Sequence, residues 1–350
     1  LVPVSASGGN TFTSKLGILS ALPLYVRTLL REMRSADVVH VRCPASISLI
    51  AIVLLTFLRK PSYRWAKYAG NWRPTRSSLS YALQRWWLNR NLHRGAVTIN
   101  GRWEGQPGHV FSFLNPCLSK EELATARSSA QVKRISKPVR LVFVGYLGES
   151  KGVSRLLHIT QRLVRELPEV HLDVVGDSPA RAEYEALARS LGIAGHITFH
   201  GWKPRTELGE IYQKAHIMIF PTDSEGWPKV VSEAMAYGIV PLVGSVSSIP
   251  QILEETKAGI AIDPYDTNTF AEAALRCIRE PEVWTRMRIA GIESAWKFTY
   301  ETYLMNVSNV FQKVWGITLA SNSTNKSGVT HILDDHTMRS TNVEIDQVQT

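Results

Sequence analysis

Beyond Pro138 the chain alternates short apolar segments with segments of helical periodicity, and this alternation limits the fold more than any other feature. Continuous apolar segments of about four to six residues predict strands that are buried on both faces, as in parallel sheets. Such strands alternating with helices predict a doubly wound α/β sheet. The predicted strands are 139–145, 171–176, 196–200, 217–220, 239–243 and 259–262. The predicted helices are 151–166, 179–192, 206–215, 228–238, 249–255 and 267–279.

Ligands of a doubly wound sheet bind at the carboxyl ends of its strands. Gly145, Gly176 and Glu225 all lie just beyond predicted strands, so we expect the functional site at this edge. Lys151 starts the helix after Gly145, where its ammonium group can reach phosphates held on the glycine turn. A glycine turn followed by a lysine is common in α/β proteins and by itself identifies no function.

The segment 223–241 contains the most informative spacing in the chain. Glu225 and Glu233 stand eight positions apart, the first in a loop and the second in the helix that follows. Pro228 suits the first position of that helix, and Gly238 suits the position just past its end. A helix N-terminus offers unpaired N–H groups and partial positive charge to a diphosphate. Carboxylates accept hydrogen bonds from hydroxyls, so the segment suits a nucleotide-sugar.

Each glutamate also has an ordinary explanation. A glutamate near a helix start can merely favour the helix dipole, and a glutamate inside a helix is commonly solvated. Ala234, Ala236 and Gly238 favour the functional interpretation, because a helix with small residues can pack closely on a sheet. A solvated surface helix has no need of them.

Taken with Gly145, Lys151 and the turn at 175–177, this segment resembles the C-terminal domain of retaining GT-B glycosyltransferases of family 4, the "group 1" transferases. The resemblance covers about residues 139–315, and residues 36–42 resemble the family's N-terminal domain more weakly. It implies an α/β fold with two Rossmann-like domains facing a cleft. It implies no cofactor and no metal.

The resemblance also implies roles for individual residues. Glu225 and Lys151 would be catalytic: Glu225 contacts hydroxyls of the donor sugar, and Lys151 neutralises the departing diphosphate. Glu233 would bind the ribose hydroxyls. The other residues expected to bind the donor are Gly145, Tyr146, Gly226, Trp227, Pro228 and Lys229. Gly145 would admit the phosphates close to the backbone, and the 226–227 backbone would donate N–H groups to them.

Within residues 139–315 the chain departs from the family pattern in two places, and the opening of the N-terminal domain is a third departure. Tyr146 replaces an arginine that usually follows the glycine turn, which leaves Arg155 or Lys229 as candidates for a second cation. Ser247–Ser248 replaces a glycine pair, and Gln251 replaces an acid.

The first half is less regular but is also α/β in character. Its predicted strands are 36–41, 63–68 and 96–100, and its predicted helices are 46–58 and 79–92. The N-terminal domain of the family that the chain resembles opens with a strand and a glycine-rich loop, whereas the glycine-containing segment 8–10 has no apolar strand before it. The resemblance therefore leads us to expect that the opening of the first domain is missing and that the chain is a fragment. Segment 67–72 is expected either to line the acceptor side or to form an aromatic packing corner. The expected division is a domain at 1–120, a linker at 121–138, a donor domain at 139–317 and a polar, disordered tail at 318–350.

Charge is distributed unevenly within the net +10. Residues 1–138 hold 20 Lys+Arg and 5 Asp+Glu, and the remainder holds 20 and 25, so the two parts carry +15 and −5. This asymmetry favours an anionic membrane surface as a partner of the first half, with a merely solvated basic surface as the alternative. No nucleic-acid-binding pattern is present, so we expect no nucleic acid.

The basic, aromatic segment 73–94 with Trp86 and Trp87 could lie on lipid headgroups or pack in the core. The run 47–58 is too short to span a bilayer and predicts a buried helix. Three isolated cysteines indicate a reducing compartment and argue against zinc. We expect a cytoplasmic protein, peripheral at the inner membrane face.

The resemblance implies transfer of a hexosyl-type sugar from a nucleotide-diphosphate donor to a glycan or lipid-linked acceptor with retention, as in surface polysaccharide synthesis. One alternative is a nucleotide-sugar epimerase on the same architecture. Another is a non-catalytic subunit that binds nucleotide-sugars or acts as a scaffold.

Overall fold

A computed structural model describes residues 12–74, 77–319, 329–330 and 343–344, without the side chains of 12–20, 329–330 and 343–344. The chain divides into two compact units, Leu1–Tyr303 and Leu304–Thr350. Both large sheets belong to the first unit. In the second, the short strands β11 (Val329–Thr330) and β12 (Val343–Glu344) pair antiparallel. Segment 8–10 and most of the tail expected to be disordered lie outside the described residues, and the predicted domain boundaries stay predictions.

The larger sheet is parallel throughout and doubly wound, as expected. Its strand order is β10-β9-β8-β5-β6-β7. The strands are β5 (Val139–Val144), β6 (Val170–Val175), β7 (Ile197–Gly201), β8 (Ile217–Phe220), β9 (Val240–Gly244) and β10 (Ile260–Ile262). From the central pair β5 and β8, the chain winds outward in opposite directions. The carboxyl ends of β5 and β8 therefore form the topological switch point, where ligands of such sheets bind.

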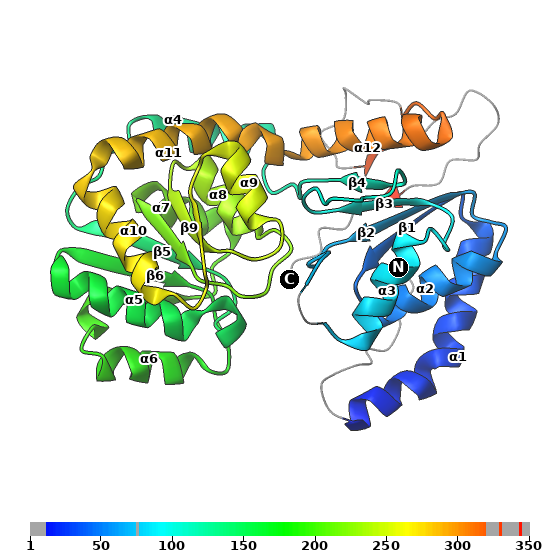
Figure 1. Ribbon diagram of the computed structural model, residues 1–350, viewed down its shortest axis with the longest axis horizontal. Helices are drawn as coiled ribbons and strands as arrows, with labels where there is room; N and C mark the ends of the chain where they lie inside the picture. Colours follow the sequence, from blue (N-terminus) through cyan, green and yellow to red (C-terminus); the bar gives the residue numbers. More distant parts are fainter. Residues whose placement is uncertain (1–11, 75–76, 320–328, 331–342, 345–350) are drawn as a thin grey trace. The chain divides into compact units, whose positions relative to one another are not determined.

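Helices cover both faces of this sheet (Figure 1). One face carries α5 (Val153–Glu166), α6 (Arg181–Ser190) and α10 (Thr267–Arg279). The other carries α7 (Arg205–Lys214), α8 (Lys229–Ala236), α9 (Ile249–Thr256) and α11 (Pro281–Ser294). In α5, buried Val153, Leu156, Thr160 and Leu163 recur at helical spacing, so a single stripe faces the sheet. The short turns η1 (Glu149–Lys151), η2 (Ala194–His196) and η3 (Ala295–Phe298) connect elements.

The smaller sheet is also parallel, in the order β1-β2-β3-β4. Its strands are β1 (Val38–Cys43), β2 (Tyr63–Tyr68), β3 (Ala96–Ile99) and β4 (Val110–Ser112), with helices α1 (Phe12–Ser35), α2 (Ser46–Phe57) and α3 (Leu79–Asn89). Ile52 and Leu55 of α2 are buried, which confirms the predicted buried helix. Neither α1 nor β4 was expected from the sequence.

The segment expected to be a linker contains the helix α4 (Lys120–Gln131). A capping box starts it: the Ser119 hydroxyl accepts from the Glu122 N–H at 3.1 Å, and the Glu122 carboxylate accepts from the Ser119 N–H at 2.6 Å. Leu123, Ala126 and Ala130 are buried, so this helix belongs to the core despite its Ala/Ser-rich composition. A last helix, α12 (Tyr300–Trp315), follows η3.

Candidate donor site

Lys151 and Glu225, which are distant in the sequence, form an ion pair. Lys151 follows β5 and Glu225 follows β8, so the pair lies at the switch point of the sheet. Both side chains are mostly buried, with 25% and 17% of their surface exposed. The structure thus brings together the two residues for which the resemblance implies catalytic roles.

Tight contact between two loops holds this pair in place. The Ser150 carbonyl accepts from the Thr222 hydroxyl at 3.0 Å and from the Asp223 N–H at 3.1 Å. Gly152 has φ +81°, and a Cβ there would lie 2.2 Å from the Pro221 carbonyl oxygen. Only glycine fits such a position, and the adjacent Lys151 is thereby directed at the Glu225 loop.

Helix α8 presents its N-terminus to the same loop. Pro228 was predicted to be the first residue of the helix. In the structure it is the N-cap, and the first helical residue is Lys229. At the other end Gly238 has φ +65°, and its N–H donates to the Met235 carbonyl at 3.0 Å. The predicted position of Gly238 just past the helix is confirmed. The N-terminal N–H groups of α8 can therefore serve an anion bound at the switch point.

Gly226 and Trp227 are fixed in the core. A Cβ at Gly226 would lie 2.1 Å from the Ala69 carbonyl oxygen, and the Ser248 hydroxyl donates to the Gly226 carbonyl at 2.7 Å. The Trp227 ring stacks on Phe298 with centroids 5.5 Å apart. Only the backbone of this segment is left for the predicted phosphate contact.

The residues that depart from the family pattern have contacts of their own. Ser247 has φ +53°, a conformation that favours glycine, so a glycine pair in relatives would fit this turn. Gln251 accepts from the backbone N–H of Arg102 at 2.9 Å within the first unit.

Glu233 lies one turn into α8 and is largely buried. The Tyr212 hydroxyl donates to its carboxylate at 3.0 Å. Burial raises the pKa of the Glu233 carboxyl above its usual value, and Arg205, the Tyr212 hydrogen bond and Lys229 offset this only in part. An acceptor of hydroxyl hydrogen bonds is therefore available beside the α8 N-terminus, although the contact shown is with Tyr212 and not with the Lys151–Glu225 pair.

Comparison with known proteins agrees with this geometry. Residues 125–294 match the family described as glycosyl transferases group 1. The chain is thus similar to the group 1 glycosyltransferases over slightly less than half of its length. It is 28% identical to a D-inositol 3-phosphate glycosyltransferase of Corynebacterium diphtheriae, over 53% of this chain and 46% of the relative. It is 30% identical to the Thermobifida fusca protein of the same name, over 61% and 52%. The chain thus spans about half the length of the curated relatives it matches.

Solved structures give the fold class. A sucrose-phosphate synthase from Thermosynechococcus elongatus superposes with TM-score 0.68 at 19% identity, covering 89% of this chain and 82% of that one. Anabaena Alr3699/HepE in complex with UDP superposes with TM-score 0.65 at 14% identity, covering 83% and 82%. These likenesses confirm the predicted GT-B fold.

Arg155 and Lys229 were the two residues that the sequence left as candidates for a second phosphate cation. The Arg155 guanidinium lies 3.3 Å from the Asp223 carboxylate and donates to the Pro221 carbonyl at 3.0 Å, so its charge is already engaged. Lys229 is exposed at the first residue of α8. Tyr146 is 60% exposed beside the site. Lys229 is therefore better placed than Arg155 to replace the missing arginine.

Asp223 and Tyr265 were not expected at the site. The Tyr265 hydroxyl donates to Asp223 at 2.8 Å, and the Arg155 guanidinium lies 4.7 Å from the Tyr265 ring centroid. That hydrogen bond to Asp223 raises the pKa of the Tyr265 hydroxyl. Asp223 could have been predicted at the site from its position two residues before Glu225 in the sequence. Tyr265 follows β10, and only the order of the strands in the sheet brings it to the site.

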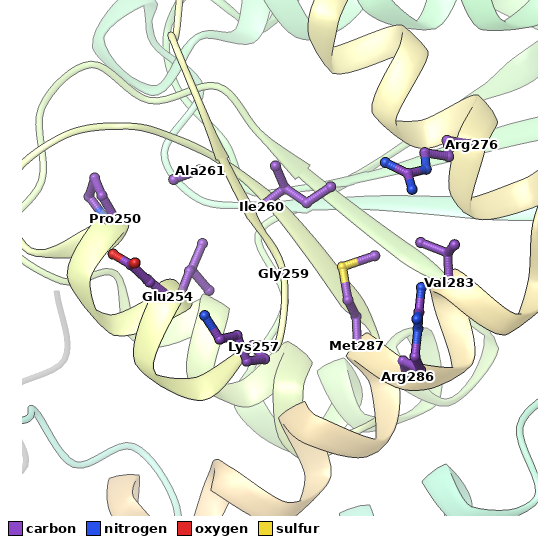
Figure 2. A pocket seen from close by; sticks show the side chains of 11 residues that line it. Pro250, Glu254, Lys257, Gly259, Ile260, Ala261, Arg276, Val283, Arg286 and Met287 are labelled. Carbon is purple, nitrogen blue, oxygen red and sulfur yellow. The ribbon is translucent and has the colours of Figure 1, made fainter.

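A pocket of about 530 Å³ opens elsewhere, at the edge strand β10 between α9, α10 and α11 (Figure 2). Apolar residues line it together with Lys257, Arg276 and Arg286, and neither Lys151 nor Glu225 takes part. A polar hollow of about 450 Å³ beside α7 includes Asp173 and His200, 2.8 Å apart. Within the described part of the chain, no helix is long and apolar enough to cross a membrane, and no three His, Cys, Asp or Glu side chains could together hold a metal ion.

Proposed function

We propose that the protein transfers a sugar from a nucleotide-diphosphate donor to a glycan or lipid-linked acceptor, with retention at the anomeric carbon. The observation that carries this proposal is the Lys151–Glu225 pair at the β5/β8 switch point, beside the N-terminus of α8. Cations and helix N-termini at one point suit a diphosphate, and carboxylates suit the hydroxyls of a sugar.

The chemistry follows from where charge develops. As the bond to the sugar breaks, negative charge grows on the diphosphate, and Lys151 with the α8 N–H groups stabilises it. A bound donor competes for both members of the ion pair: its phosphate takes Lys151 and its sugar hydroxyls take Glu225. Glu233 would exchange the Tyr212 hydroxyl for ribose hydroxyls. The acceptor hydroxyl forms its bond to the anomeric carbon on the same face from which the diphosphate departs, and its proton passes to the departing diphosphate, so retention requires no protein nucleophile.

Gly145 supports close approach of the donor to the backbone. A Cβ at Gly145 would lie 3.4 Å from the Phe220 ring, which is ordinary contact. The chain itself therefore does not demand glycine there, in contrast to Gly152 and Gly226. A donor that lies against the backbone at position 145 would require glycine there, because a side chain would occupy its space.

Two rival functions make different predictions. An epimerase would change the sugar during incubation with donor alone, and a transferase would need an acceptor. A scaffold subunit would bind nucleotide diphosphate and transfer nothing. For the transferase, we place the protein at the cytoplasmic face of a membrane, where its basic first half would meet anionic lipid.

The decisive experiment compares sugar transfer by Glu225→Gln and Glu233→Gln with the wild type. Removing either charge should lower kcat/KM roughly a hundredfold or more, as for lost transition-state contacts. Glu254→Gln, in the Figure 2 pocket, is the matched control and should retain full activity. Near-wild-type transfer by either site variant would remove that glutamate from the proposal.

A further inference from the structure

The first half contains a long segment without acidic residues. Between Asp37 and Glu104 there is no Asp or Glu, whereas the same segment holds 11 Lys and Arg. Arg64 and Lys67 are buried, and Arg59, Lys60 and Arg90 are among those exposed. The segment itself supplies no carboxylate to neutralise these cations, so its surface favours anionic partners.

Helix α3 has a stripe of solvent-exposed apolar residues along one side. Leu79, Leu83 and Trp86 are 90%, 42% and 48% exposed, and Arg90 follows just past the helix end. Their spacing of four, three and four residues places them on one side of the helix. Gln84 and Leu88, on the opposite side, are fully buried. One side of this helix therefore packs on the core, and the apolar residues on its other side are left exposed by the described part of the chain.

The end of α2 adjoins the end of α3. The Trp87 indole donates to the Thr56 hydroxyl at 2.9 Å. The Arg64 guanidinium donates to the Leu58 carbonyl at 2.6 Å and to the His93 carbonyl at 3.1 Å, which ties the ends of both helices together. Figure 1 shows α2 and α3 on the same side of the β1–β4 sheet. Phe57, 78% exposed, and the cations Arg59 and Lys60 thus extend the surface around Trp86.

Tryptophan and arginine meet within this surface. The Arg90 guanidinium lies 5.5 Å from the Trp86 ring centroid. Aromatic rings and cations on snorkelling side chains are typical of the boundary between headgroups and acyl chains. Nucleic acid would use the cations but would leave Leu79, Leu83 and Phe57 without a partner. The combination favours lipid.

We propose that α3 and the adjoining end of α2 dock on the surface of an anionic lipid bilayer. Leu83, Trp86 and Phe57 enter the boundary below the headgroups, and Arg59, Lys60 and Arg90 contact lipid phosphates. This docking rests on the proposed function, because it identifies the element through which the transferase would contact the membrane. The docking itself requires no transferase activity.

Sedimentation with lipid vesicles tests the docking. Wild-type protein should bind vesicles of phosphatidylcholine mixed with phosphatidylglycerol far better than vesicles of phosphatidylcholine alone. Leu83→Gln combined with Trp86→Gln should weaken binding to mixed vesicles by roughly tenfold or more. Ile289→Gln, which changes an equally exposed side chain on α11, should bind like the wild type. Arg90→Gln should weaken binding roughly fivefold, and Arg286→Gln should not.

Three results would overturn the docking proposal. One is wild-type protein that does not sediment with mixed vesicles. Another is a Leu83/Trp86 variant that binds them as tightly as Ile289→Gln. The third is stronger binding to a single-stranded RNA than to the vesicles. Vesicle binding without any sugar transfer would instead reject the proposed function and leave the docking intact.

Discussion

Burial of the Glu233 carboxyl has a measurable consequence for stability. Because its pKa is raised in the folded protein, the folded state binds this proton more tightly than the unfolded chain does. The wild type therefore loses stability as pH rises above the usual value of about 4.5. Glu233→Gln removes that loss. We predict that this variant has a higher Tm than the wild type at pH 8 and no such advantage at pH 4, measured by thermal melting across pH.

Glu254→Gln is the control for this comparison, because Glu254 is exposed on α9. Its Tm should follow the wild type at every pH. A Glu233→Gln variant that is less stable than wild type at pH 8 would show that the Tyr212 hydrogen bond outweighs the cost of burial.

The Lys151–Glu225 pair should show strong coupling. Lys151→Met leaves the Glu225 carboxylate mostly buried without its cation, which should cost about 1–2 kcal/mol of unfolding free energy. Lys151→Met combined with Glu225→Gln removes both charges and should recover most of that loss. Urea denaturation of the four proteins in the double-mutant cycle measures the coupling. Additive effects would mean that the two side chains do not interact in solution.

At the residue level, the sequence could predict which residues lie near one another where each directly follows a strand. Glu225 and Lys151 each follow a predicted strand, and knowing which strands are central suffices to bring them together. The Asp223–Arg155–Tyr265 cluster could not be foreseen in this way. Its members come from the ends of β8, α5 and β10, and only packing and strand order make them neighbours.

At the level of elements, the strands of the larger sheet were predicted within about two residues, because buried parallel strands are continuously apolar. Helix α4 was missed because its Ala- and Ser-rich sequence has a weak apolar stripe. The capping box Ser119–Glu122 was the available signal. The exposed stripe of α3 could not be separated from a buried one by periodicity alone, since both have the same spacing.

Three glycines that differ in φ and in the space around them allow the cost of an added methyl group to be compared. Gly238 has φ +65°, and a Cβ there would lie 3.0 Å from the Ala130 Cβ and 3.2 Å from the Arg288 Cγ. Gly192 has φ +71° with open space around it, and Gly195 has open space without a positive φ. We predict that Gly238→Ala costs about 2 kcal/mol or more, Gly192→Ala about 1 kcal/mol and Gly195→Ala under about 0.5 kcal/mol.

Equilibrium unfolding in urea measures this series, and the order of the three variants is the critical outcome. Equal losses at Gly238 and Gly192 would mean that α4 and α11 shift away from the added methyl group. A loss at Gly195 as large as the others would contradict the conformational explanation.

For the whole molecule, the sequence predicted the fold class and showed the charge asymmetry between the two halves. It did not show which cationic region of the second half binds a ligand. Two cationic regions of the second half, the switch point and the Figure 2 pocket, could each attract a nucleotide diphosphate. Composition cannot distinguish them, since both combine lysine or arginine with a carboxylate. The arrangement differs: only the switch point adds a helix N-terminus and loops held rigid by Ser150 and Gly152.

Ligand-induced stabilisation of the whole chain separates these two regions. A ligand at about one hundred times its Kd adds about 2.7 kcal/mol, which should raise Tm by a few degrees. We predict such a shift for the wild type with UDP or another nucleoside diphosphate from a panel, each compared with its monophosphate. Lys151→Met should lose the shift relative to its own ligand-free Tm, because the diphosphate loses its cation at the switch point. Arg286→Gln should keep it, whereas the reverse pattern would move the nucleotide to the pocket at β10.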